Sequence, residues 1–166
     1  MFVRTASSRD IPAIRALLVE TWHDTYDAIY GKDRVTQITD SWHSMTLLGE
    51  RLSLPRSEFL VADDGKMIGG MAFATAQDEG KTLVLHQLYV APSCQGQGIG
   101  GLLLDEVEGC FPEAGTVRLF VEERNAKAVS FYLAQGFSQV GKIDQEVVGG
   151  PAEPALVFER PIIWAD

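Results

Sequence analysis

The feature that most restricts the fold of this chain is the glycine-rich segment Gln95–Gly101, which reads Gln-Gly-Gln-Gly-Ile-Gly-Gly. It follows an alternating stretch, Thr82–Val90, that predicts a strand, and a helical pattern continues from about Gly98 to Cys110. Glycines let a backbone turn sharply and approach a ligand closely, and a helix start presents unpaired N–H groups and the positive end of the helix dipole. The segment therefore predicts an anion site suited to a phosphate or pyrophosphate. The alternative is a helix start that needs only flexibility.

The same glycines satisfy two phosphate-binding patterns. Gly96, Gly98 and Gly101 match the dinucleotide fingerprint GxGxxG, and Glu122 follows about twenty residues later. With Gln95 in front, the loop equally matches QxxGxG. An antiparallel pattern precedes the loop and too little chain follows it for a doubly wound sheet with a substrate domain, so a nucleotide-cofactor enzyme becomes the minor alternative. A P-loop is excluded because no Gly-Lys-Ser/Thr follows.

The rest of the chain predicts one α+β domain, residues 1–166, with a mostly antiparallel sheet that turns locally parallel at the strand–helix–strand unit 83–121. A first helix begins at the capping-box pair Ser7 and Asp10. A second helix, roughly Val35 to Leu54, ends at Pro55. The other expected elements are strands at Phe2–Thr5, Phe59–Ala62, Met67–Ala76, Thr82–Val90, Val117–Val121, Phe137–Gln145 and Ala155–Pro161, and a helix at Ala126–Gln135.

The charge and the cysteine content of the chain limit the kinds of partner that we expect it to bind. The chain has 14 basic and 23 acidic residues, a net charge of −9, and no basic run long enough to follow a phosphate backbone. Its two cysteines, Cys94 and Cys110, lack CxxC spacing, which disfavours a disulfide framework and a cysteine-based zinc site. The start lacks a signal-peptide core, and the longest apolar run, Met67–Ala76, is too short to span a bilayer. We expect a cytoplasmic protein without nucleic-acid or membrane partners.

Two longer stretches resemble a known superfamily. "LYVAPSCQGQGIGGLLLDEV" resembles motif A of the GNAT superfamily of N-acetyltransferases, and "VEERNAKAVSFYLAQGF" resembles its motif B. Asn125, Phe131, Tyr132, Gly136 and Phe137 stand at the usual places of motif B. The early segment "ETWHDTY" and the acidic balance vaguely resemble the polyamine acetyltransferases of this superfamily.

The resemblance implies a GNAT-type acyltransferase fold, with a central parallel strand pair that splays apart, and acetyl-CoA as co-substrate without a metal. The strand before the loop is then bulged, and main-chain groups of Leu88 and Val90 pair with the pantetheine arm. The N–H of Val90 faces the thioester oxygen, where charge develops, and Asn125 binds the arm from the other wall. The backbone amides expected to hold the pyrophosphate are those of Gln95, Gly96, Gln97, Gly98 and Gly100 and, less surely, Ile99 and Gly101.

The resemblance also indicates catalytic candidates. Tyr132 could donate a proton to the leaving thiolate. Alternatively, Tyr132 is an aromatic residue of the core that packs beside Phe131. His86 stands where many members carry a glutamate that acts as base or orients water, and a structural histidine is an equally good interpretation. The expected activity is acetyl transfer to a primary amine, either a small amine such as a polyamine or a peptide amine. A non-catalytic acyl-CoA-binding or regulatory module is the alternative. The sequence does not decide whether the protein forms a homodimer.

For several other residues we expect a structural or surface role and no part in the chemistry. Trp22 and Trp42, at helical spacing among aliphatic residues, are expected in the core. Glu122 is expected in a solvent-exposed turn. Glu20, His23 and Tyr26 are expected to be surface or packing residues, and Cys94 to be incidental.

Overall fold

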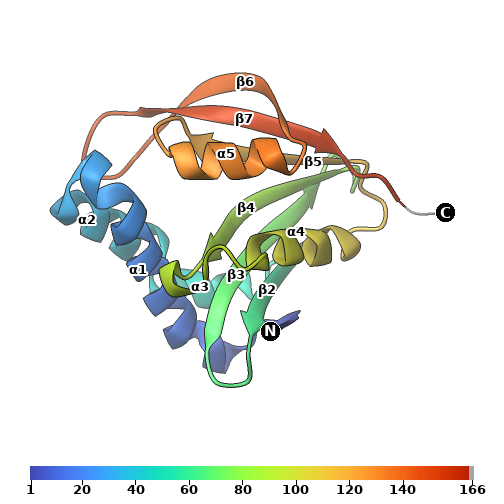
Figure 1. Cartoon of the computed structure of the whole chain (residues 1–166), viewed down its shortest axis with the longest axis horizontal. Helices are drawn as coiled ribbons and strands as arrows, with labels where there is room; N and C mark the ends of the chain where they lie inside the picture. Colours follow the sequence, from blue (N-terminus) through green and yellow to red (C-terminus); the bar gives the residue numbers. More distant parts are fainter. Residues whose placement is uncertain (165–166) are drawn as a thin grey trace.

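Seven strands form one mixed sheet in the order β1-β2-β3-β4-β5-β7-β6 in the computed structural model, which describes residues 1–164 (Figure 1). All neighbouring strands are antiparallel except β4 and β5, which confirms the predicted α+β sheet with one central parallel pair. The strands are β1 (Phe2–Thr5), β2 (Ser57–Asp63), β3 (Ile68–Gln77), β4 (Thr82–Val90), β5 (Thr116–Glu122), β6 (Ser138–Gln145) and β7 (Glu153–Pro161); the helices are α1 (Ile11–Tyr30), α2 (Lys32–Trp42), α3 (Met45–Arg51), α4 (Ile99–Gly109) and α5 (Ala126–Ala134).

The parallel pair is joined along only part of its length. Pairing covers Thr82–Leu85 of β4 and Thr116–Leu119 of β5, whereas β4 continues to Val90 and β5 to Glu122. Figure 1 shows β4 running away from β5 and β7 toward the side of the molecule where α1 lies. The sheet is therefore splayed at this point, as the superfamily resemblance implies.

A bulge in β4 sits where the separation begins. Phe73 and Ala74 of β3 pair with Gln87 and Leu85, so that His86 has no partner in the ladder. Such an extra residue bends its strand and increases the local twist. The bulge thus turns the second half of β4 away from β5.

Helices cover both faces of the sheet. A Cβ placed on Gly70 of β3 would lie 3.0 Å from Leu103 and 3.2 Å from Ile99, both on α4. Phe73, three residues further on, lies under the Arg51 guanidinium of α3, 5.9 Å from the ring centroid. Because side chains alternate between the faces of a strand, α4 and α3 lie on opposite faces.

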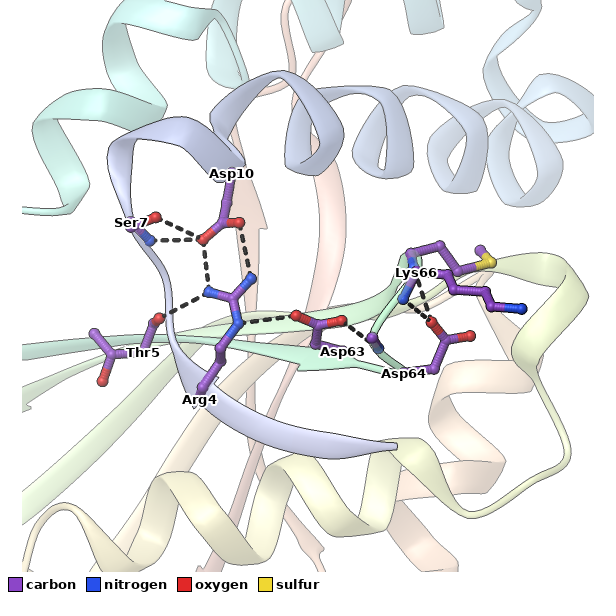
Figure 2. Close-up of polar contacts among 9 residues, drawn as sticks. Arg4, Thr5, Ser7, Asp10, Asp63, Asp64 and Lys66 are labelled. Atoms are coloured by element: carbon purple, nitrogen blue, oxygen red, sulfur yellow. Dashed lines mark hydrogen bonds and ion pairs between the residues drawn. The ribbon is translucent and has the colours of Figure 1, made fainter.

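An arginine ties the first elements together (Figure 2). Arg4 of β1 donates from Nε to Asp63 at 2.9 Å and from its two terminal nitrogens to Asp10 at 2.8 and 2.9 Å. Asp10 also accepts from the backbone N–H of Ser7 at 2.8 Å. The guanidinium of Arg4 holds the pKa of Asp10 well below its usual range. This network joins β1, the turn before α1 and the end of β2.

The predicted single helix from Val35 to Leu54 is wrong. The chain leaves helical geometry at His43 (φ −126°, ψ 35°), and Ser44 starts a new helix by accepting the N–H of Leu47 on its hydroxyl at 3.2 Å. The run of apolar residues continues across the break, so the hydrophobic pattern alone does not show it. Most other predicted elements are present with boundaries that differ by one or two residues. None of the helices among residues 1–164 is long and apolar enough to cross a membrane.

Candidate active site

A cavity of about 590 Å³ opens where β4 and β5 separate. One end is bordered by the glycine-rich loop and the start of α4, and the other by aromatic side chains of α1 and α2. The second halves of β4 and β5, together with α5, form the walls between these ends. Of the predicted site residues, only Gln97 is absent from the lining, and its side chain is exposed. The others all border the cavity: His86, Leu88, Val90, Gln95, Gly96, Gly98, Ile99, Gly100, Gly101, Asn125 and Tyr132.

The loop has the geometry of an anion cradle. Gly96 and Gly98 have φ of 79° and 81°, in the left-handed region that favours glycine. A Cβ at either position would meet no atom within 4 Å, so both glycines border open space. Gly98 is also the N-cap of α4, whose first N–H groups lack helical partners. These groups fit a phosphate without further side chains.

Gly100 serves a different purpose, because a Cβ there would lie 3.1 Å from the Phe131 ring of α5. The side chain of Gln95 ties the loop to its surroundings. It donates to the carbonyl of Val90 at 3.0 Å and accepts from Lys127 at the start of α5. Lys127 therefore brings a positive charge to the loop.

The free edge of β4 presents backbone groups to the cavity. The N–H of Ala91 donates to Gly69 of β3 at 2.8 Å. Successive residues of a strand direct these groups to alternate edges, so the groups of Val90 and Leu88 face the gap toward β5. The Val90 carbonyl is already bonded to Gln95, which leaves its N–H for a ligand. An extended, amide-containing arm fits this edge.

The position of Tyr132 on α5 is compatible with both roles weighed from the sequence. Its ring packs edge-on against Phe131 and Phe137, with centroids 5.1 and 5.5 Å away, and the residue is only 9% exposed. It also lines the cavity. Burial raises the pKa of Tyr132, so the hydroxyl keeps its proton at neutral pH and can donate a hydrogen bond.

His86, the bulged residue, lies on the face of the sheet that carries Phe73. Its Nε2 is 2.8 Å from the Thr75 hydroxyl, and its ring is tilted against Phe73 at 5.7 Å. His86 is exposed at the rim of the cavity, and partial loss of water around its ring together with, secondarily, the charge of Arg51 lowers the pKa of His86. The imidazole is therefore neutral at pH 7 and has the protonation state that a base requires.

Asn125 spans the cavity from α5 to α1. Its Oδ1 accepts the N–H of Ala128 at 3.2 Å and caps α5, and its Nδ2 donates to the Tyr26 hydroxyl at 3.1 Å. Both polar groups of the side chain thus have a partner within the protein, and a second amide hydrogen remains for a ligand.

The end of the cavity away from the glycine-rich loop is an aromatic wall, by which we mean Trp22, Tyr26, Tyr30, Trp42 and Tyr89. Ring centroids lie 4.4 Å apart for Trp22 and Tyr26, 5.6 Å for Tyr26 and Tyr30, and 6.1 Å for Trp22 and Trp42. Trp22 and Trp42 were expected to be core residues, and they also line the cavity. Helical spacing identifies the packed stripe but not the cavity that it borders.

His43 was not singled out from the sequence, yet it lines this end of the cavity and is only 2% exposed. Burial, followed by the charges of Arg51 and Arg15, lowers the pKa of His43 to about 3. Arg51 lies 3.4 Å from Nδ1 and can only donate, so the proton of the neutral ring is on Nε2. This Nε2 has no partner among the described residues.

Two more buried atoms in the same lining, Oγ1 of Thr21 and Oε1 of Gln87, are likewise unpaired among the described residues. The indole N–H of Trp22 also lacks a partner with hydrogen-bond geometry. It lies near the Tyr89 hydroxyl, and this proximity partly offsets the increase in the Tyr89 pKa that burial causes. Buried polar groups normally have a partner, because leaving one unpaired costs free energy.

Glu122 is not a solvent-exposed turn residue, as the sequence suggested. Its side chain is 9% exposed, lines the cavity, and accepts from the Tyr30 hydroxyl at 2.7 Å and from Arg124 at 3.1 Å. Tyr30 is far away in the sequence, so no local pattern shows this pairing.

Comparisons with known proteins agree with this geometry. A sequence profile of the acetyltransferase (GNAT) family matches residues 13–137. The chain is 29% identical over 138 residues to the peptidyl-lysine N-acetyltransferase YiaC of Escherichia coli, a match that covers 81% of this chain and 82% of that protein. It is 28% identical over 145 residues to a spermidine N(1)-acetyltransferase of Thermoplasma acidophilum, covering 81% and 86%.

The crystal structure of the PaiA N-acetyltransferase from Thermoplasma acidophilum in complex with coenzyme A has the same fold. Its TM-score is 0.83 at 23% identity, over 97% of this chain and 98% of that one. Because the family profile matches well over half of its length, this chain belongs to the acetyltransferase (GNAT) family and is an acyl-CoA-dependent N-acetyltransferase.

Proposed function

We propose that this protein transfers an acetyl group from acetyl-CoA to a primary amine by direct attack, and that it does so in the cytoplasm. The observation that carries the proposal is that one cavity joins the glycine-rich loop to the aromatic wall. A thioester held from the loop along β4 and an amine held at the aromatic wall would meet between the strands. No covalent enzyme intermediate is then required.

On the donor side, the N–H groups at Gln95–Gly101 would hold the pyrophosphate, and Lys127 adds a positive charge beside them. Leu88 and Val90 would pair with the pantetheine, with Asn125 on the opposite wall. Bound acetyl-CoA supplies an activated acyl group with a thiolate as its leaving group. The free N–H of Val90 is suited to stabilise negative charge on the acyl oxygen.

Two side chains are suited to proton movement. The Tyr132 hydroxyl, which lines the cavity and keeps its proton, would donate to the departing sulfur. A primary amine is almost fully protonated at pH 7, so it must lose a proton before it attacks. Neutral His86 would accept that proton directly or through water. The desolvating aromatic wall also lowers the pKa of an ammonium group, which favours the nucleophilic form.

The relatives indicate which amines to test first. Two of them are named for peptidyl-lysine and for spermidine. We therefore propose a panel of spermidine, a peptide with one lysine and a blocked amino terminus, a peptide with a free amino terminus, and an aminoglycoside.

The test is release of the CoA thiol, with mass spectrometry of the acetylated amine. We expect at least one amine of the panel to turn over, and Tyr132→Phe to lower kcat while CoA affinity stays unchanged. Tight CoA binding without turnover of any amine would overturn the enzymatic proposal and favour a non-catalytic acyl-CoA-binding module.

A further inference from the structure

The segment between β6 and β7, residues 146–152, supplies part of the wall at the acceptor end. We refer to it as the β6–β7 loop. Its Val147 is only 7% exposed and packs against Trp22, Tyr26, Val35 and Ile38 in a small hydrophobic cluster separate from the main core. Val147 also lines the cavity. The shape of this end therefore depends on where the β6–β7 loop rests.

One side chain of α2 makes most of the polar contacts to this loop. Arg34 donates from Nε to the Val148 carbonyl at 3.2 Å and from one terminal nitrogen to the carbonyls of Pro151 and Val147 at 3.1 and 3.4 Å. Its other terminal nitrogen lies 3.5 Å from Glu153 at the start of β7. The Arg34 side chain is only 16% exposed, so its contacts with Val147, Val148 and Glu153 are partly shielded from competing water, whereas the contact with Pro151 is exposed.

The same arginine belongs to a network that reaches the cavity. Arg34 and Arg124 lie near the Tyr30 ring, 4.7 and 5.1 Å from its centroid, and both contact Glu153. Tyr30 in turn donates to Glu122, and these two residues line the cavity. Arg34 thus connects the β6–β7 loop to the aromatic wall through Tyr30.

The loop passes so close to Arg34 that a side chain at Gly150 would displace the guanidinium. A Cβ placed on Gly150 would lie 2.5 Å from Cζ of Arg34. At Gly149, which has a φ of 83°, an added Cβ would overlap with Gln37. Two adjacent glycines therefore let the backbone cross the guanidinium at the distance that its hydrogen bonds need.

We propose that Arg34 is a positioning residue for the acetyl acceptor: it holds the β6–β7 loop on α1 and α2, and thereby fixes Val147 as a wall of the acceptor end. Its link to catalysis rests on the proposed function, because it takes this end of the cavity as the amine site. Lysine cannot replace Arg34, since a single ammonium cannot reproduce the fork of guanidinium donors that binds several carbonyls and Glu153 together.

The test compares Arg34→Met, Arg34→Lys and Gly150→Ala with the matched control Arg118→Met. Arg118 also forms an ion pair, with Glu159 at 2.8 Å, but it lies outside the cavity. Hydrogen exchange of the amides in residues 146–152 measures how firmly the loop is held. Steady-state kinetics measure KM for acetyl-CoA and for the best amine of the panel separately.

In both Arg34 variants we expect amide exchange in the β6–β7 loop to become about tenfold faster. The KM of the amine should rise about tenfold, while the KM of acetyl-CoA stays within about twofold, because only the acceptor end loses its wall. Gly150→Ala should change both quantities in the same direction, and Arg118→Met neither. Unchanged amide exchange in the β6–β7 loop would overturn the proposal that Arg34 holds this loop. Faster exchange with an unchanged KM for the amine would overturn the proposed role of Arg34 in acceptor binding.

These outcomes are distinct from failure of the proposed function. If no amine turns over in the wild type, the proposed function fails, and the exchange experiment still decides whether Arg34 holds the loop.

Discussion

Replacing Gly98 by alanine has two effects that can be measured separately: a loss of folding stability, because alanine disfavours the left-handed backbone, and a loss of affinity for CoA. Gly98 has a φ of 81°, and an added Cβ would meet no protein atom within 4 Å. The methyl group therefore costs stability only through the left-handed backbone, about 1–2 kcal/mol. For a chain of this size, that free energy corresponds to a fall in Tm of about 2–8 °C.

The same methyl group would project into the open space that we assign to the pyrophosphate. Displacing one charged hydrogen bond to the loop costs about 1.5–3 kcal/mol, which is an increase in the Kd of CoA of about 10- to 150-fold. Calorimetric titration of CoA measures this change, and differential scanning calorimetry measures the change in stability.

Gly65 provides a matched control. It lies in the turn between β2 and β3, has a φ of 94°, and its Cβ would likewise meet no atom within 4 Å. Gly65→Ala should lower Tm about as much as Gly98→Ala and leave the Kd of CoA unchanged. Equal CoA affinities of the two variants would refute the assignment of the loop to the pyrophosphate.

Three further predictions concern the catalytic candidates and the fold. Tyr132→Phe should lower kcat by about 100-fold or more with the Kd of CoA unchanged, and an unchanged kcat would assign Tyr132 to packing. The acidic limb of the pH profile of kcat/KM should have an apparent pKa below 6.5 and should disappear in His86→Ala, whereas it should persist in His43→Gln because the pKa of His43 is lowered to about 3. A limb that persists in His86→Ala would return His86 to a structural role. Arg4→Met should destabilise the fold by about 2 kcal/mol, seen as a fall in Tm of about 4–8 °C at pH 7. Because the folded-state pKa of Asp10 lies below its unfolded value, this difference should be complete above about pH 4 and shrink as pH falls further, so that a Tm difference undiminished in acid would contradict it.

The elements around the glycine-rich loop were predictable because their signals are local. Gly98 at the start of α4 and Gly136 after α5 mark helix ends through backbone conformations that glycine favours, with φ of 81° and 89°. Eleven of the residues named from the loop spacing and from the resemblance of its flanks border the cavity, and their roles in binding and catalysis stay predictions.

The aromatic wall and the β6–β7 loop were predictable only in part, because their contacts join distant segments. The hydrogen bond of Tyr30 to Glu122 spans 92 positions, and that of Arg34 to Val147 spans 113. Neither pairing leaves a periodic or local pattern in the chain. His43 was missed for another reason: it stands at a break between two helices that the apolar spacing runs straight across.

The most direct test of the account is inhibition by a bisubstrate conjugate, in which the best amine of the panel is joined to CoA through an acetyl bridge. One cavity that holds both co-substrates predicts that the conjugate competes with acetyl-CoA and with the amine alike, and that it binds more tightly than CoA. A conjugate that competes with acetyl-CoA but not with the amine would contradict direct transfer between the separated strands β4 and β5.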